Sequence, residues 1–437
     1  MTQLRFILTP VGSSGDVHPF VAVGAALRAR GHDVVVVTGE PFRAVIERAG
    51  LRTIVTHSTE EFDELSADPT LWHPRRGLKL VLRATASAIR KDYDAIASVY
   101  EPGRSVLVGH TLGFATRLFE ERHGAPAATI QLAPSTLRTD YRQPAVTPGY
   151  DLAGAPRLMK RALWCMVDRI AIDPHVLPEL NRFRRDLGLP RVSRVFASWI
   201  HSPQRVIGLF PDWFAPWQPD WPPQLRLTGF PLYDERDQHD ASPDLEAFLA
   251  AGDPPVLFTP GSANRTAAPF FAAAADAAQR LGRRALLLTR YSAQLPAALP
   301  PNVRHESYVP FSLVLPRCAA IVHHGGIGTC AQGLAAGVPQ VTMPLGFDQP
   351  DNTTRLWKLG VARWVAPRQF TGPRVARVLA ALLDDGRVAS ACRRWADAMR
   401  RARPVEETCD LLEAVMPASS PTGSLPRESQ SRGAARD

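Results

Sequence analysis

Several features that would place this chain in a special class of protein are missing. No stretch of the 437 residues approaches the roughly 20 consecutive apolar residues that a bilayer span needs. The first residues lack a basic leader and a small-residue cleavage site. The five cysteines are scattered, without Cys-x-x-Cys spacing, which argues against a disulfide framework and a zinc site. We therefore expect a cytoplasmic protein with reduced thiols.

A concentrated basic region is also missing, although the net charge is +9. Lysine and arginine are spread along the chain rather than gathered into an arm or stripe with interleaved aromatic residues. Nucleic acid is therefore not expected as a partner. A weaker alternative is attraction to an acidic acceptor or to anionic lipid headgroups, the latter as a peripheral contact at the inner membrane surface, which would suit an enzyme that handles amphiphiles.

The length and the pattern of apolar residues predict two α/β domains. A chain of 437 residues exceeds one comfortable hydrophobic core. Over residues 1–235, apolar runs of strand length alternate with helical segments, which predicts a doubly wound parallel sheet. A polar linker follows, and a second alternation of the same kind runs over 236–416. Residues 417–437 are rich in Pro, Ser and Gly and are expected to be a disordered tail.

The most informative segment is AAIVHHGGIGTCAQGLAAG, which places a glycine-rich turn between a strand and a helix. Gly325, Gly326 and Gly328 would let the backbone approach a ligand, and the helix N-terminus favours an anion. His324 and Thr329 could add hydrogen-bond donors, so a diphosphate is the natural ligand. The alternative is an ordinary tight turn beside a surface histidine.

A metal site is not expected at this turn. His323 and His324 are adjacent in an extended segment and point to opposite faces, and no third ligand follows at metal spacing.

Two further polar groups follow predicted strands. Asp348 and Gln349 come after VPQVTMP, at a sheet edge where ligands bind in open α/β folds, and could hold sugar hydroxyls. Asp348 could instead cap the helix that begins near Pro350. In the first domain, PVGSSGDVHPF places Asp16 at the cleft edge of its sheet, where helix capping is again the alternative.

Together these segments resemble a known family. The order H-x-G-G-x-G-T, G-V-P, D-Q-x-x-N is similar to the donor-binding signature of nucleotide-sugar glycosyltransferases with the GT-B fold, which include UDP-glycosyltransferases, sterol glucosyltransferases and antibiotic glycosyltransferases. The resemblance implies two facing Rossmann-like domains, an acceptor-binding one over 1–235 and a donor-binding one over 236–416. Gln332 stands where many members place a glutamate on the ribose, so the nucleotide preference is left open.

The resemblance also implies roles for individual residues. Asp16 would be the general base of an inverting reaction that needs no metal or other cofactor, with His18 as the reserve candidate. The donor would be held by these residues: Gly12, Ser13, Gly261, Ser262, Val309, His324, Gly325, Gly326, Gly328, Thr329, Asp348 and Gln349.

Longer strings such as ADPTLWHP, PELNRFRRDLGLPR and WIHSPQRVIGLFPDWFAPWQPDWP resemble the rhamnosyltransferases of rhamnolipid biosynthesis. This implies a deoxythymidine-diphosphate rhamnose donor and a hydroxyalkanoyloxyalkanoate acceptor. The alternative is UDP-glucose transfer to a sterol or polyketide-like product. Trp72, Phe114 and Trp164 are expected to line an apolar acceptor pocket.

Two hypotheses from other classes remain open at the level of sequence. One is a nicotinamide-dependent oxidoreductase with Gly12 and Gly15 at a dinucleotide turn and Glu40 on a ribose, although the third glycine is missing. The other is a non-catalytic subunit that binds nucleotide-sugar or lipid and activates a partner.

Overall fold

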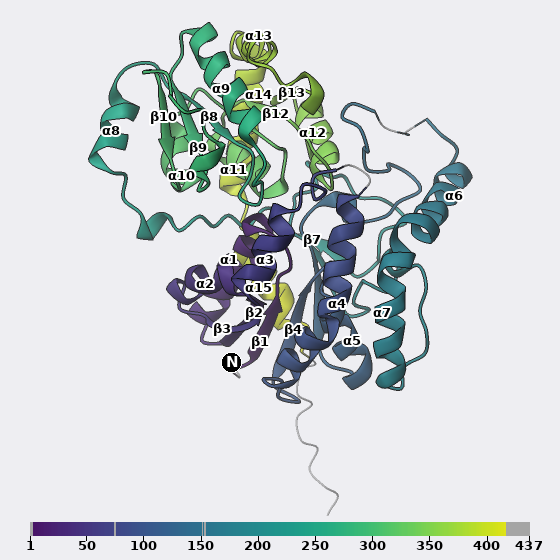
Figure 1. The fold of residues 1–437 in the computed structure, drawn as a ribbon. Coiled ribbons are helices and arrows are strands. Elements are labelled where there is room, and N and C mark those ends of the chain that lie inside the picture. Colours follow the sequence, from purple (N-terminus) through teal and green to yellow (C-terminus); the bar gives the residue numbers. More distant parts are fainter. Residues whose placement is uncertain (1–2, 74–75, 151, 153, 417–437) are drawn as a thin grey trace, which may run out of the picture.

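The computed structural model describes residues 3–73, 76–150, 152 and 154–416 as two α/β domains that face each other (Figure 1). The segment 417–437, predicted to be a disordered tail, lies outside the described residues.

The first sheet has seven parallel strands in the order β3-β2-β1-β4-β5-β6-β7. Its strands are β1 (Arg5–Thr9), β2 (Asp33–Gly39), β3 (Arg52–His57), β4 (Ser105–His110), β5 (Ala127–Gln131), β6 (Val206–Gly208) and β7 (Leu225–Leu227). Side chains on both faces are buried, Phe6 and Leu8 on one and Ile7 on the other, as expected for a parallel sheet covered by helices.

Helices cover both faces of this sheet. One face packs against α1 (Ser14–Ala29) and α2 (Arg43–Arg48), and the other against α4 (Gly77–Ala97), α5 (Phe114–His123) and α7 (Asp173–Asp186). Helix α3 (Thr59–Ala67) borders the cleft. Helix α6 (Arg157–Val167) is joined to α7 by one π-helical turn, Asp168–Ile172, and lies at the outer edge of the domain (Figure 1).

The second sheet has six parallel strands in the order β10-β9-β8-β11-β12-β13. They are β8 (Val256–Thr259), β9 (Ala285–Leu288), β10 (Val303–Glu306), β11 (Ala320–His323), β12 (Gln340–Thr342) and β13 (Ala362–Trp364). The helices of this domain are α8 (Pro243–Ala250), α9 (Ala268–Leu281), α10 (Phe311–Val314), α11 (Ile327–Ala336), α12 (Gln349–Lys358), α13 (Gly372–Leu383) and α14 (Gly386–Arg401).

The last described helix, α15 (Pro404–Glu413), packs on the first domain beside α1. Arg30 forms an ion pair of 2.6 Å with Asp410, and the hydroxyls of Thr228 and Thr408 lie 2.9 Å apart. The chain therefore crosses back after completing the second sheet. The domain boundaries at 235 and 416 stay predictions.

The strand orders decide where loops from different parts of the chain meet. In each sheet the order reverses beside the first strand, between β1 and β4 and between β8 and β11. Loops after the carboxyl ends of these strands diverge and leave a crevice. The predicted pair of facing Rossmann-like domains is thus confirmed. Among the described residues, no helix combines the length and apolar character that crossing a bilayer requires.

Candidate active site

A cavity of about 2630 Å³ lies between the domains. It is lined by the segments that follow β1, β4, β8, β11 and β12, so both switch points open into it. Every predicted site residue except Gly325 lines this cavity, including Val309, Thr329 and Ser262. Gly325 lies within the same turn, at a φ of +91° that favours glycine.

Asp16 is held by the start of α1. The Ser13 backbone N–H donates to Asp16 Oδ2 at 2.7 Å, and the Ser13 hydroxyl lies 3.1 Å from the same oxygen. Gly12 has a φ of +135°, and a Cβ there would lie 2.2 Å from Asp16 Oδ2. The capping alternative is therefore part of the arrangement. Because both bonds use Oδ2, Oδ1 is the oxygen that could receive a proton from a ligand.

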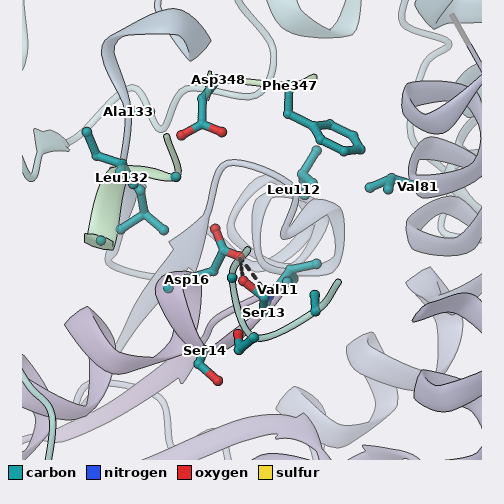
Figure 2. A pocket seen from close by; sticks show the side chains of 18 of the residues that line it. Val11, Ser13, Ser14, Asp16, Val81, Leu112, Leu132, Ala133, Phe347 and Asp348 are labelled. Carbon is teal, nitrogen blue, oxygen red and sulfur yellow. Dashed lines mark hydrogen bonds between the residues drawn. The ribbon is translucent and has the colours of Figure 1, made fainter. Parts of the chain in front are cut away.

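A second carboxylate faces Asp16 across the cleft. Figure 2 shows the carboxyl groups of Asp16 and Asp348 pointing toward each other from opposite domains. Burial raises the pKa of Asp16 to about 6, against the opposing effect of the Ser13 hydrogen bonds. Burial, followed by the negative charge of Asp16, raises the pKa of Asp348 to about 7. Near neutral pH, Asp16 is thus mostly ionised and Asp348 is partly protonated.

Asp348 does not cap α12, which corrects the capping alternative for this residue. It occupies the N-cap position, but its side chain makes no capping hydrogen bond. Asn352 Nδ2 instead donates to Asp348 Oδ2 at 2.6 Å. The Gln349 amide oxygen accepts from Leu345 N at 2.7 Å. Gln349 therefore orders the loop that carries Asp348, and its NH₂ group is the part that could reach a sugar.

The ring of His324 sits between two glycines of the second domain. A Cβ on Gly261 would lie 2.6 Å from His324 Cε1, and one on Gly326 would lie 2.4 Å from Nε2. Burial lowers the pKa of His324 to about 4, so the ring is neutral. Its Nδ1 is buried without a hydrogen-bond partner among the described residues. A buried polar atom of this kind is expected to find its partner in a ligand.

The N-termini of α1 and α11 approach each other at the cleft. A Cβ built on Gly328 would lie 3.4 Å from the Gly15 Cα. Helix α11 has Gly326 as its N-cap residue, with no side-chain capping bond and no acidic residue in its first turn. The N–H groups at the start of α11 are therefore placed to bind an anion beside His324, next to the loop that carries Asp16.

His18 and Gln332 also face the cavity. His18 Nδ1 lies 3.2 Å from the Tyr233 carbonyl, and burial lowers the His18 pKa. With Nδ1 donating to that carbonyl, Nε2 is the nitrogen that could accept a proton. Gln332 is 9% exposed on α11, next to the anion-binding site.

The three predicted acceptor residues differ in their environment. Trp72 packs edge-on against Phe347 of the second domain, with ring centroids 5.9 Å apart. Trp164 donates through Nε1 to the Thr139 carbonyl at 3.3 Å. Phe114, the first residue of α5, is 2% exposed and packs in the core cluster, although it is also among the cavity-lining residues.

His110 and Phe347 are among the cavity residues that were not predicted from the sequence. His110 ends β4, accepts from Leu112 N through Nδ1 at 3.2 Å, and has its pKa lowered to about 4 by burial. Its proton is therefore on Nε2. Phe347 has a φ of +58° and lies beside Asp348 (Figure 2). The position of His110 after a strand at the switch point was the available signal, whereas nothing in the sequence marked Phe347.

Among the described residues, no group of three or more His, Cys, Asp or Glu side chains could hold a metal ion. The metal-independent reaction stays a prediction.

Comparison with known proteins agrees with this geometry. Residues 6–139 match the glycosyltransferase family 28 N-terminal domain, and residues 285–414 match the erythromycin biosynthesis protein CIII-like C-terminal domain. The chain is 33% identical to O-mycaminosyltylonolide 6-deoxyallosyltransferase of Streptomyces fradiae, over 94% of this chain and 97% of the relative. It is 30% identical to glycosyltransferase GtfE of Amycolatopsis orientalis, over 82% of this chain and 85% of that protein.

Solved structures share the fold at low identity. The calicheamicin glycosyltransferase CalG4 matches with a TM-score of 0.71 and 20% identity, covering 96% of this chain and 100% of the other. The spinosyn rhamnosyltransferase SpnG, complexed with thymidine diphosphate, matches with a TM-score of 0.68 and 19% identity over 94% and 100%.

These matches favour a transferase over the oxidoreductase and the non-catalytic subunit. Glu40, the expected ribose ligand of the former, instead pairs with Arg43 at 2.8 Å. The two facing sheets, the anion-binding site at α11 and the full-length relatives lead to one assignment: the chain belongs to the nucleotide-sugar glycosyltransferases of the GT-B type, with a family 28 N-terminal domain and an erythromycin CIII-like C-terminal domain.

Proposed function

We propose that this enzyme transfers a deoxyhexose, rhamnose first among the candidates, from a deoxythymidine-diphosphate sugar to a hydroxyl of a lipidic acceptor such as a hydroxyalkanoyloxyalkanoate. The observation that carries the proposal is the placement of Asp16 between the anion-binding site of α11 and the apolar wall of the cavity. The thymidine diphosphate bound to the spinosyn rhamnosyltransferase supports this choice of nucleotide.

In the proposed reaction, Asp16 Oδ1 takes the proton of the acceptor hydroxyl as the acceptor oxygen attacks the anomeric carbon. The bond from that carbon to the diphosphate oxygen breaks, and the configuration inverts. The N–H groups of α11 and the neutral His324 ring stabilise the charge that develops on the diphosphate. Asp348, partly protonated, can donate to or accept from a sugar hydroxyl.

The apolar wall supports a lipidic acceptor. Val81, Leu112 and Leu132 line the same cavity as Asp16, and Phe347 lines it from the second domain (Figure 2). Each acyl methylene buried against such a wall gains about 0.8 kcal/mol. A polyketide-like acceptor is the second candidate, because the Streptomyces fradiae relative is named as a tylonolide glycosyltransferase.

A donor and acceptor screen tests the proposal. Nucleotide release would be measured with deoxythymidine-diphosphate rhamnose and UDP-glucose, each combined with a hydroxyalkanoyloxyalkanoate, a macrolide aglycone and a sterol. We expect the first donor and the lipidic acceptor to give the highest kcat/KM. Preference for UDP-glucose or for a macrolide would overturn the proposed specificity.

The pH dependence of the same reaction tests the base. With a pKa near 6, Asp16 is active in its ionised form, so kcat/KM should rise about tenfold per pH unit below 6 and level off above it. A flat profile between pH 5 and 7 would contradict this assignment.

A further inference from the structure

Helix α6 buries a lysine and exposes several apolar side chains, which is unusual for a helix at the surface. Lys160 is 2% exposed, and its Nζ donates to the Tyr141 carbonyl at 2.6 Å. Leu158 and Met166, in contrast, are 77% and 51% exposed. A helix on a water-facing surface normally buries its apolar side chains and exposes its lysines.

The exposed apolar residues form one continuous row. They recur every four residues through α6 and the π turn, which places them along one side of the helix. We call this row the apolar stripe, and its members are Leu158, Ala162, Met166 and Ile170. Met159, 50% exposed, lies beside it.

Basic side chains flank the apolar stripe. Between Arg157 and Ile172 the sequence holds four basic residues, of which Lys160 is buried and Arg161 pairs with Asp140. The one acidic residue, Asp168, is buried and paired with Arg138 and Arg194. Arg157 and Arg169 are exposed and form no ion pair with a described residue. An exposed apolar row with flanking arginines is typical of a helix that lies in the interface of an anionic membrane.

The stripe leads to the acceptor side of the cavity. Ile170 is 65% exposed and yet lines the cavity, as does Val146, which is 87% exposed. Trp164 and Val167, on the inward side of the same helix, also line it. One helix therefore joins the outer surface of the first domain to the space where the acceptor is expected (Figure 1).

We infer that the apolar stripe of α6 docks on the surface of an anionic lipid bilayer and brings the acceptor side of the cavity to the membrane. A second copy of the chain fits less well, because pairing two stripes would bring the flanking arginines together, whereas anionic headgroups would neutralise them. The link to acceptor delivery rests on the proposed lipidic acceptor, but vesicle binding itself does not.

Co-sedimentation of the full chain with vesicles tests the inference. We expect binding to phosphatidylcholine vesicles that contain phosphatidylglycerol, and weaker binding to phosphatidylcholine alone or in high salt. The double variant Leu158→Glu/Met166→Glu should reduce the partition coefficient at least about tenfold. Trp217→Glu is the control, because Trp217 is 48% exposed and lies outside both the stripe and the cavity lining.

Two measurements separate the possible failures. Thermal unfolding checks that both variants fold, and Arg157→Glu/Arg169→Glu tests the same surface through charge alone. The inference is overturned if the wild-type protein does not bind anionic vesicles, or if the Leu158→Glu/Met166→Glu variant binds them as well as the wild type. A dimer that dissociates in the α6 variant would assign the stripe to a second copy and also overturn it. If vesicles bind but no lipidic acceptor is glycosylated, the proposed function fails and the docking surface stands.

Discussion

Helices α1 and α11 begin at equivalent positions of the two domains, but their N-termini carry different side chains. Each follows a strand at a switch point and points its N-terminus into the cleft. In α1 the first turn carries Asp16, which accepts from Ser13 N. In α11 the N-cap is Gly326, and the first turn carries no acidic residue. The N-terminus of α1 thus carries the proposed base, whereas the N-terminus of α11 is available to an anion. Side chains, and not the shared fold, decide the role of each helix start.

Replacing the carboxylate of α1 should have the largest effect. Asp16→Asn keeps an oxygen for Ser13 but removes the base, so we expect kcat to fall by about 10²- to 10⁴-fold. Binding of the nucleoside diphosphate should be unchanged, as measured by calorimetry. Ser13→Ala, which removes only the weaker hydroxyl contact to Asp16, should lower kcat much less. Full activity in Asp16→Asn would show that Asp16 is not the base and would leave His18 as the candidate.

Substitutions at the N-terminus of α11 should weaken donor binding. Gly326→Ala places a methyl group 2.4 Å from His324 Nε2, so the ring must move. We expect the Kd for the nucleoside diphosphate to rise about 10- to 100-fold in Gly326→Ala and in His324→Ala. Gly386→Ala is the control, because a Cβ there meets nothing within 4 Å. Unchanged affinity in both variants would rule out this site for the diphosphate.

The raised pKa of Asp348 should appear in the stability of the protein. The folded state holds this proton up to a pH of about 7, compared with an ordinary value of 3.8, so the free energy of unfolding falls as the pH rises between them. Asp348→Asn removes this cost and should stabilise the protein by about 1 to 3 kcal/mol at pH 8, and by much less at pH 4. Urea unfolding at both pH values measures the difference. An equal effect at the two pH values would contradict a raised pKa.

The smallest expected effect is at the aromatic contact between the domains. Trp72 and Phe347 meet edge-on, and such pairs contribute about 0.5 to 1.5 kcal/mol beyond their buried area. A double-mutant cycle with Trp72→Ala and Phe347→Ala should give a coupling energy of this size in urea unfolding. Additive effects would show that the two rings do not act together in solution.

Local patterns allowed much of this protein to be predicted. Apolar runs and glycine turns place β1, α1, β11 and α11, because buried parallel strands and helix starts have strong sequence signals. The polar residues after those strands were also identified, and the structure brings Asp16 and Asp348 to face each other. The fold prediction is confirmed, whereas the roles of the individual site residues stay predictions.

Contacts between distant segments could not be predicted. The return of α15 to α1 depends on pairs such as Arg30 and Asp410, which are 380 residues apart. Phe347 lines the cavity and has a left-handed backbone, a conformation that a bulky residue rarely adopts without tertiary support. The exposed row on α6 has the same cause: helical periodicity reveals an apolar stripe but not whether another element covers it.

The sequence by itself determined the two alternating α/β halves, the glycine turn before α11 and the carboxylate after β1, because each depends on neighbours along the chain. Only the tertiary structure decided that Gly15 and Gly328 meet, that the charge of Asp16 helps to raise the pKa of Asp348, and that α6 turns its lysine inward. Burial and electrostatic coupling arise from residues far apart in the chain, and no local pattern records them.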